Sequence, residues 1–126
     1  MNSLPTIFTA STTHGAGRGK RIGTPTINLN LEDVPKEVTH GIYACYATIE
    51  DKKYPAVAHF GPRPVFQDTE AFEVHLLDTH IEKFPESITV ELVKYLRDVQ
   101  DFPSTEALLD AIQKDILAAK SILQSL

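Results

Sequence analysis

The chain has 126 residues, of which 42% are hydrophobic and 23% are charged. These values predict one globular domain over residues 1–126 and argue against a disordered chain. A formal net charge of −5 disfavours nucleic-acid binding, and no segment approaches the roughly 20 apolar residues of a membrane span. The single cysteine, Cys45, excludes an internal disulfide and a cysteine-based zinc site. Because the start has no signal-peptide pattern, we expect a cytoplasmic protein whose partner is a small molecule or another protein, with no membrane partner.

Six short segments have the composition of β-strands. β-Branched and aromatic residues are frequent in them, and turn residues separate them at intervals of about 8–12 residues. Ile88, Val90 and Leu92 alternate with polar residues, as in a strand with one buried face. A polar turn at 50–53 predicts a hairpin, with Pro55 at a strand start or a sheet edge. This pattern favours a barrel or a sandwich. The expected strands cover residues 8–13, 26–31, 41–49, 54–60, 72–77 and 87–96.

The last part of the chain predicts one helix. Pro103 cannot continue a preceding element, and Ser104 is a good N-cap. Hydrophobic residues then recur at helical spacing, so we expect the helix to pack on the β-structure; a partner-binding helix is the less favoured alternative. The expected apolar stripe contains Leu108, Ile112, Ile116, Ala119 and Leu123, widened by Leu109 and Leu117.

A glycine-rich basic segment lies near the amino end. Four of the six glycines fall between residues 15 and 23, together with Arg18, Lys20 and Arg21. Exposed backbone N–H groups in such a loop form concave anion sites, and these cations oppose the overall negative charge. The spacing is neither that of a Walker A loop nor that of a Rossmann fingerprint. Composition alone is equally compatible with a phosphate cradle and with a mobile surface loop.

The segment Pro-Thr-Ile-Asn follows directly. Thr26 and Asn28 are two residues apart, so in a strand their side chains share one face. A hydroxyl and an amide oxygen on one face can help to hold a cation such as Mg²⁺ that also binds phosphates. Taken alone, the pair is better explained by turn chemistry. Beside a basic glycine loop, it favours a metal–nucleotide site.

A carboxylate interrupts the apolar strand predicted over residues 72–77. Glu73 and His75 are two residues apart and therefore point to the same face. That face is either a solvated exterior or a polar cleft, and we expect His75 to hydrogen-bond or shape a site there rather than titrate in a reaction.

Several motifs occur in a fixed order along nearly the whole chain: GAGRG at 15–19, GTPTIN at 23–28, GIYA at 41–44, GPRP at 61–64, EVHLLD at 73–78 and YLRD at 95–98. These motifs and their order resemble those of the riboflavin kinase family. The resemblance is to the kinase domain alone, without the adenylyltransferase module that is fused to it in many bacterial relatives. The resemblance implies a mainly β fold, a six-stranded antiparallel Greek-key β-barrel with a C-terminal α-helix packed on it. It also implies transfer of the ATP γ-phosphoryl group to the 5′-hydroxyl of riboflavin, which yields FMN. We expect a monomer that acts on these small molecules.

The resemblance also implies roles for individual residues. Glu73 would be the catalytic base, and Arg97 would assist phosphate charge or close a lid over the flavin; its alternative is a surface arginine paired with Asp98 or Asp101. Thr26 and Asn28 would bind ATP phosphates and Mg²⁺ or another divalent cation. The other expected ATP-binding residues are Gly15, Gly17, Arg18, Gly19, Lys20 and Arg21. The expected flavin-binding residues are Leu77, Phe84, Arg97 and Phe102, of which the apolar ones are equally plausible as core.

Two alternatives keep the barrel but change the function. Ile81 and Pro85 stand where the family pattern has glycines, which motivates a catalytically weak or inactive barrel that binds flavin or nucleotide. Some small β-barrels bind single-stranded nucleic acid, but the acidic charge counts against that reading.

Overall fold

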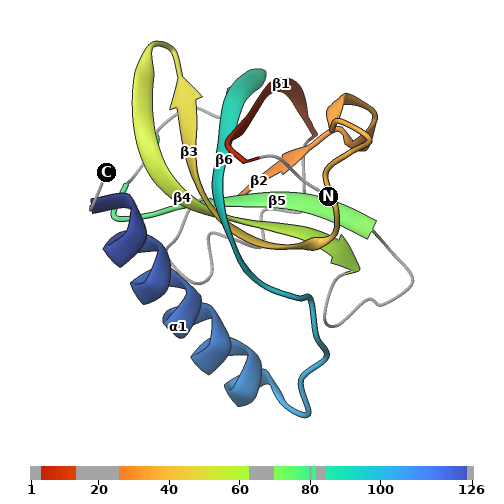
Figure 1. Cartoon of the computed structure of the whole chain (residues 1–126), viewed down its shortest axis with the longest axis vertical. Helices are drawn as coiled ribbons and strands as arrows, with labels where there is room; N and C mark the ends of the chain where they lie inside the picture. The colour runs from red at the N-terminus through yellow and green to blue at the C-terminus, as the bar shows by residue number, and fades with distance from the viewer. Residues whose placement is uncertain (1–3, 14–25, 63–69, 80, 82–84, 125–126) are drawn as a thin grey trace.

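The computed structural model describes residues 4–13, 26–62, 70–79, 81 and 85–124. Figure 1 shows a β-barrel with a helix lying along its outside. Within these residues no helix is both long enough and apolar enough to cross a membrane. The elements are β1 (Thr6–Thr13), β2 (Thr26–Leu29), the 3-10 turn η2 (Leu31–Asp33), β3 (Gly41–Ile49), β4 (Lys52–Pro62), β5 (Glu70–Leu76), β6 (Ser87–Arg97) and α1 (Thr105–Gln124).

The six strands close into a barrel in the order β1-β2-β5-β4-β3-β6, and every neighbouring pair is antiparallel. Strands β3, β4 and β5 follow one another as a meander. Strand β2, which precedes them in the sequence, lies beside β5, the last of the three. This arrangement is a Greek key. The expected six-stranded antiparallel barrel with a C-terminal helix is therefore confirmed.

The predicted hairpin joins β3 to β4. Glu50 and Asp51 form its two-residue turn, with φ angles of 47° and 71° that match the twist of antiparallel strands. Since β4 begins at Lys52, Pro55 lies inside the strand, and the expectation that it starts a strand or stands at an edge is wrong. The Pro55 carbonyl accepts from the N–H of Leu77. Pro55 has no N–H to return to the Leu77 carbonyl, and that carbonyl accepts from the Thr79 hydroxyl at 2.9 Å. A side chain thus replaces the donor that proline lacks.

The interior of the barrel holds the main core. Ile88, Val90 and Leu92 are all buried there, as their alternation predicts. The Phe72 ring meets the Phe8 ring edge-on at 5.7 Å between centroids and the tilted Phe60 ring at 5.2 Å. Because alternate residues of each strand fill this interior, the intervening residues must lie on the outer face of the barrel.

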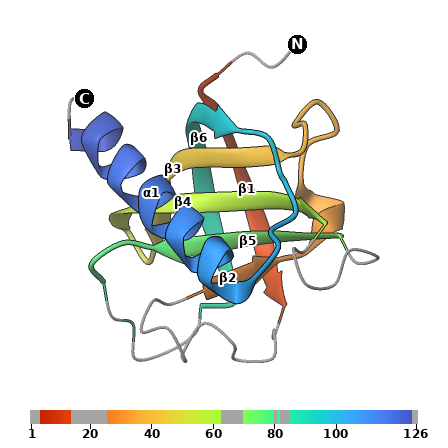
Figure 2. The ribbon, with the colours of Figure 1, turned by 90° about the horizontal axis from the view of Figure 1, so that it is seen from below.

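Helix α1 covers the outside of the barrel beside β3 and β4 (Figure 2). The Ser104 hydroxyl accepts from the N–H of Ala107 at 3.1 Å, which confirms the predicted N-cap. The buried helix residues are Asp115, Ala119 and Leu123, which face a second apolar cluster on the barrel. That cluster contains Ile42, Ala44, Val57 and Leu77 from the barrel side.

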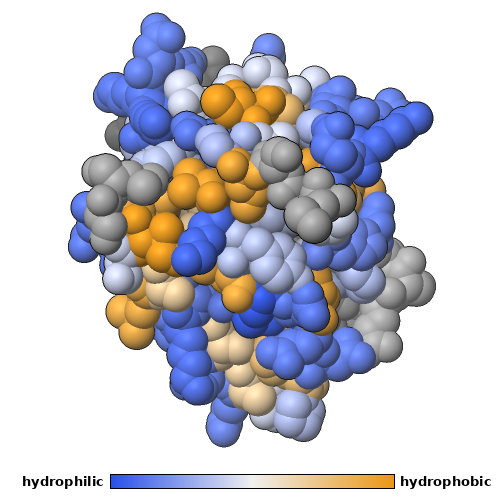
Figure 3. All heavy atoms as spheres, in the orientation of Figure 1, coloured by the Kyte–Doolittle hydropathy of each residue, from blue (hydrophilic) through white to orange (hydrophobic). Residues whose placement is uncertain are grey.

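The apolar stripe of α1 is narrower than predicted. Leu109 and Leu117 are 42% and 65% exposed, so the expectation that they widen the buried face is wrong. The helix rests on the convex outside of a barrel, which offers it a narrow strip of contact. Figure 3 shows both hydrophobic and hydrophilic side chains at the surface on the face seen in Figure 1, as is usual for the surface of a folded protein.

Candidate functional site

Strand register places several predicted site residues in one row on the outer face of the barrel. Asn28 of β2 lies opposite Glu73 of β5, and Glu73 lies opposite His59 of β4. His59 lies opposite Ile42 of β3, and Ile42 lies opposite Arg97 at the end of β6. Directly opposed residues on neighbouring strands are close enough for their side chains to interact. The barrel therefore lines up Asn28, Glu73 and Arg97 from three separate parts of the sequence.

A hydrogen bond joins the next pair in this register. Thr26 lies opposite His75, and the Thr26 Oγ1 is 3.0 Å from the His75 Nδ1. Burial lowers the pKa of His75 to about 4, although the negative charge of Asp115 opposes the shift. The ring is therefore neutral near pH 7. In the tautomer with its proton on Nε2, Nδ1 accepts from the Thr26 hydroxyl and fixes its orientation, in agreement with the hydrogen-bonding role predicted for His75.

Asn28 carries a buried acceptor that lacks a partner. Its Oδ1 has no hydrogen-bond partner within the described part of the chain. Asn28 lies on the outer face of β2, as does Thr26. A buried amide oxygen without a donor is costly, and a bound cation would satisfy it. The described residues contain no group of three His, Cys, Asp or Glu side chains suited to a metal ion. A Mg²⁺ ion held mainly by phosphates and water needs few protein oxygens, so Thr26 and Asn28 fit such an ion.

Glu73 lies between Asn28 and a histidine that the sequence did not point to. Glu73 and His59 are both half-buried, which is more enclosed than a solvated exterior. Burial lowers the pKa of His59, and the Glu73 carboxylate opposes that shift. The His59 Nδ1 is buried and has no hydrogen-bond partner among the residues described. The available sequence signal was a histidine within the apolar strand segment 54–60.

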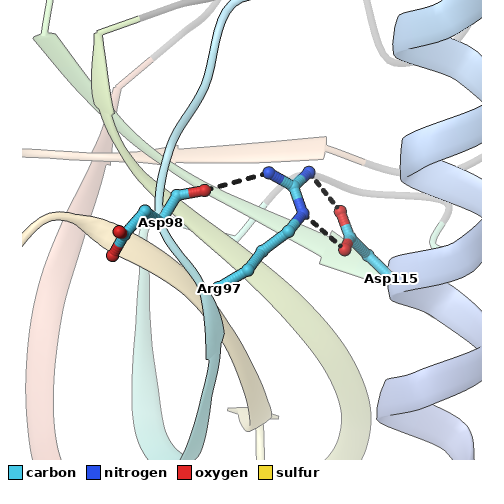
Figure 4. A network of polar contacts seen from close by, with 3 residues as sticks. All are labelled: Arg97, Asp98 and Asp115. Carbon is cyan, nitrogen blue, oxygen red and sulfur yellow. Dashed lines mark hydrogen bonds and ion pairs between the residues drawn. The ribbon is translucent and has the colours of Figure 1, made fainter.

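Arg97 holds the end of β6 against the helix (Figure 4). Its Nε and Nη2 donate to the two carboxylate oxygens of Asp115 at 2.9 and 2.7 Å. Its Nη1 donates to the backbone carbonyl of Asp98 at 3.0 Å, and its guanidinium carbon lies 5.6 Å from the Phe102 ring centroid. The alternative that paired Arg97 with the carboxylate of Asp98 or Asp101 is therefore corrected: the paired carboxylate is that of Asp115. A role for Arg97 in the reaction stays a prediction.

The predicted flavin residues divide between three situations. Leu77 is 2% exposed and packs with Ala119 and Leu123, so it is a core residue, as one of the two interpretations had it. Phe102 is half-buried beside Arg97. Phe84 lies outside the described residues. The same holds for the predicted ATP-binding residues Gly15, Gly17, Arg18, Gly19, Lys20 and Arg21.

Comparison with known proteins identifies relatives along almost the whole chain. The family model described as riboflavin kinase matches residues 3–123. A riboflavin kinase from Homo sapiens is 34% identical over 131 residues, which cover 98% of this chain and 84% of that protein. A bifunctional riboflavin kinase/FMN adenylyltransferase from Pseudomonas fluorescens is 38% identical over 111 residues, or 86% of this chain. The match spans 35% of that longer protein.

Solved structures agree on the fold. A macrolide-efflux protein from Streptococcus pneumoniae superposes with a TM-score of 0.77 at 31% identity, covering 92% of this chain and 38% of that one. The riboflavin kinase from Trypanosoma brucei superposes with a TM-score of 0.63 at 20% identity, covering 98% and 83% of the two chains. Since the family model spans residues 3–123 and the match to the human riboflavin kinase covers 98% of this chain and 84% of that protein, the chain belongs to the riboflavin kinase family.

Proposed function

We propose that this protein transfers the γ-phosphoryl group of ATP to the 5′-hydroxyl of riboflavin and releases FMN and ADP, assisted by Mg²⁺ or another divalent cation. The observation that carries the proposal is the register that sets Glu73 directly opposite Asn28, beside the Thr26–His75 pair, in a riboflavin kinase family barrel. We expect a cytoplasmic monomer whose partners are the small molecules riboflavin and ATP.

Phosphoryl transfer asks the protein mainly for alignment and charge neutralisation. Thr26 and Asn28 would hold the cation against the phosphates of ATP, and the bound cation would neutralise charge that develops on the transferring group. The basic glycine loop at residues 15–21 would hold the rest of the triphosphate, by family resemblance.

Glu73 is the base in this proposal. Its carboxylate would accept a hydrogen bond from the riboflavin 5′-hydroxyl and then take the proton. In a loose transition state the hydroxyl proton leaves late, so orienting the oxygen matters more than high basicity. The half-buried position of Glu73, one strand away from Asn28, suits a group that must bring the hydroxyl next to cation-bound phosphate.

The direct test is incubation of the protein with riboflavin, ATP and Mg²⁺, with FMN measured by chromatography. Glu73→Gln should lower kcat by about 10²–10⁴-fold while riboflavin still binds. Glu91→Gln is the matched control. Glu91 of β6 is also a half-buried carboxylate, but it pairs with Lys53 of β4 at 3.4 Å. Full turnover by Glu73→Gln would remove the assigned base. Binding of riboflavin without FMN would instead favour an inactive flavin-binding barrel, which the altered 78–86 segment motivates.

A metal titration tests the other half of the site. Thr26→Ala and Asn28→Ala should each raise the Mg²⁺ concentration needed for half-maximal activity, since each loses an oxygen near the cation. Thr9→Ala serves as the control, because the Thr9 hydroxyl bonds Thr89 at 2.9 Å on the β1–β6 side of the barrel. An unchanged metal requirement in both site variants would contradict the assignment.

A further inference from the structure

His59 presents a buried polar atom to the proposed site. It alternates along β4 with Ala58 and Phe60, which face the barrel interior, so its ring is on the outer face. The ring is half-buried, and its Nδ1 is buried with no hydrogen-bond partner in the described part of the chain. Native proteins rarely leave such an atom without a partner, so a missing ligand or water is its natural complement.

The surroundings of His59 restrict what that ligand can be. Glu73 lies opposite it on one side, and the apolar Ile42 lies opposite it on the other. Neighbouring strands are about 4.8 Å apart, so a ligand group at His59 sits roughly that far from one at Glu73. A substrate with hydroxyls on successive carbons can reach both residues at once. A hydroxyl can donate or accept and therefore suits either tautomer of the ring.

We propose that His59 is a substrate-positioning residue whose Nδ1 hydrogen-bonds a hydroxyl of the polyol chain of the acceptor, near the hydroxyl that meets Glu73. The inference rests on the proposed function, because that function supplies the polyol substrate. By holding a second point of the chain, His59 restricts rotation of the reacting end and keeps it near the carboxylate. Its contribution therefore depends on the polyol and not on the flavin ring.

Binding of two flavins distinguishes this role from a merely structural one. Riboflavin carries the polyol chain, and lumiflavin carries a methyl group in its place. His59→Leu should weaken riboflavin binding roughly 5–10-fold, which is the loss of one ordinary hydrogen bond, and should leave lumiflavin binding unchanged. His59→Asn, which keeps a polar atom close to the position of Nδ1, should bind riboflavin within about twofold of the wild type. His40→Leu is the control, because His40 is an exposed histidine paired with Glu70.

Steady-state kinetics give a second readout. His59→Leu should raise the KM for riboflavin by a similar factor and leave the KM for ATP unchanged. Equal weakening of both flavins would overturn the inference and indicate a structural role, and unchanged riboflavin binding would overturn it because a water then serves Nδ1. If His59→Leu fails to fold by circular dichroism, His59→Val replaces it. Wild-type protein that binds riboflavin but makes no FMN would end the proposed kinase function, while the comparison of the two flavins would still decide the role of His59.

Discussion

His75 should make the stability of the fold depend on pH. Burial lowers its pKa from 6.5 to about 4, against the opposing charge of Asp115. On unfolding the ring regains its ordinary pKa, so between pH 6.5 and pH 4 the unfolded chain binds more protons than the folded one. The contribution of the neutral His75 ring to the free energy of unfolding is therefore fully present above about pH 6.5 and is lost as the pH falls toward 4.

The size of the effect follows from the shift. A change from 6.5 to about 4 corresponds to about 3 kcal/mol once both states are protonated, and to about 2 kcal/mol between pH 7 and pH 5. Urea unfolding followed by circular dichroism at several pH values measures it. His75→Asn is the informative variant, because its amide oxygen can still accept from Thr26 but does not titrate. Between pH 7 and pH 5 the wild type should lose about 2 kcal/mol more than His75→Asn.

Comparison of the two profiles removes the contribution of carboxylates, which both proteins share. Burial also lowers the pKa of His59, so a double variant with His59→Asn should flatten the profile further. Parallel profiles for the wild type and His75→Asn would refute the reasoning, because they would mean that the His75 ring gains its proton as readily in the folded protein as in the unfolded chain.

Three further predictions concern stability and are measured by urea unfolding. Arg97→Lys should cost about 1–2 kcal/mol, since an ammonium cannot keep both bonds to Asp115, and a double-mutant cycle with Asp115→Asn should give a coupling of about 1–3 kcal/mol; additive effects would contradict the pair. Ser104→Ala should cost about 1 kcal/mol by removing the helix cap, and Ser104→Asp should restore it. Gly41 has a φ of 159°, and Gly41→Ala would also push a methyl group into the Tyr95 ring, so the substitution should cost about 1–3 kcal/mol; a Tyr95→Ala background should relieve the part of the loss that the ring causes.

Local sequence patterns predicted the six strands and the helix, but not the 3-10 turn at Leu31–Asp33, where the strand expected over 26–31 ends early. The alternation of Ile88, Val90 and Leu92 predicted the inner face of β6, and Pro103 with Ser104 predicted the start of α1. Both signals depend on a few neighbouring residues and not on contacts with distant parts of the chain. The apolar stripe of the helix also predicted that the helix packs on the β-structure. The Greek-key order came from the family resemblance, since strand order depends on contacts between distant segments.

The site was only partly predictable for the same reason. Thr26 and Asn28 share a face by simple alternation, but their placement opposite His75 and Glu73 depends on the pairing of β2 with β5. His59 went unnoticed because nothing in its own strand shows that it lies opposite Glu73. In the helix, periodicity marked every apolar residue of a broad face, whereas the curvature of the barrel decides which of them are buried.

Asp115 connects helix packing with the electrostatics of the site. It is the one polar or charged residue among the buried residues of the described chain, at 8% exposure, and it is held by two bonds from Arg97. A buried carboxylate is unfavourable without a compensating cation, so α1 can seat its buried face only where the end of β6 supplies Arg97. The same carboxylate raises the pKa of His75 on β5, against the larger effect of burial. The helix that closes the outer apolar cluster therefore also places a negative charge close enough to act on His75, the hydrogen-bond partner of Thr26. Asp115 thus couples the packing of α1 to the electrostatics of the Thr26–His75 pair.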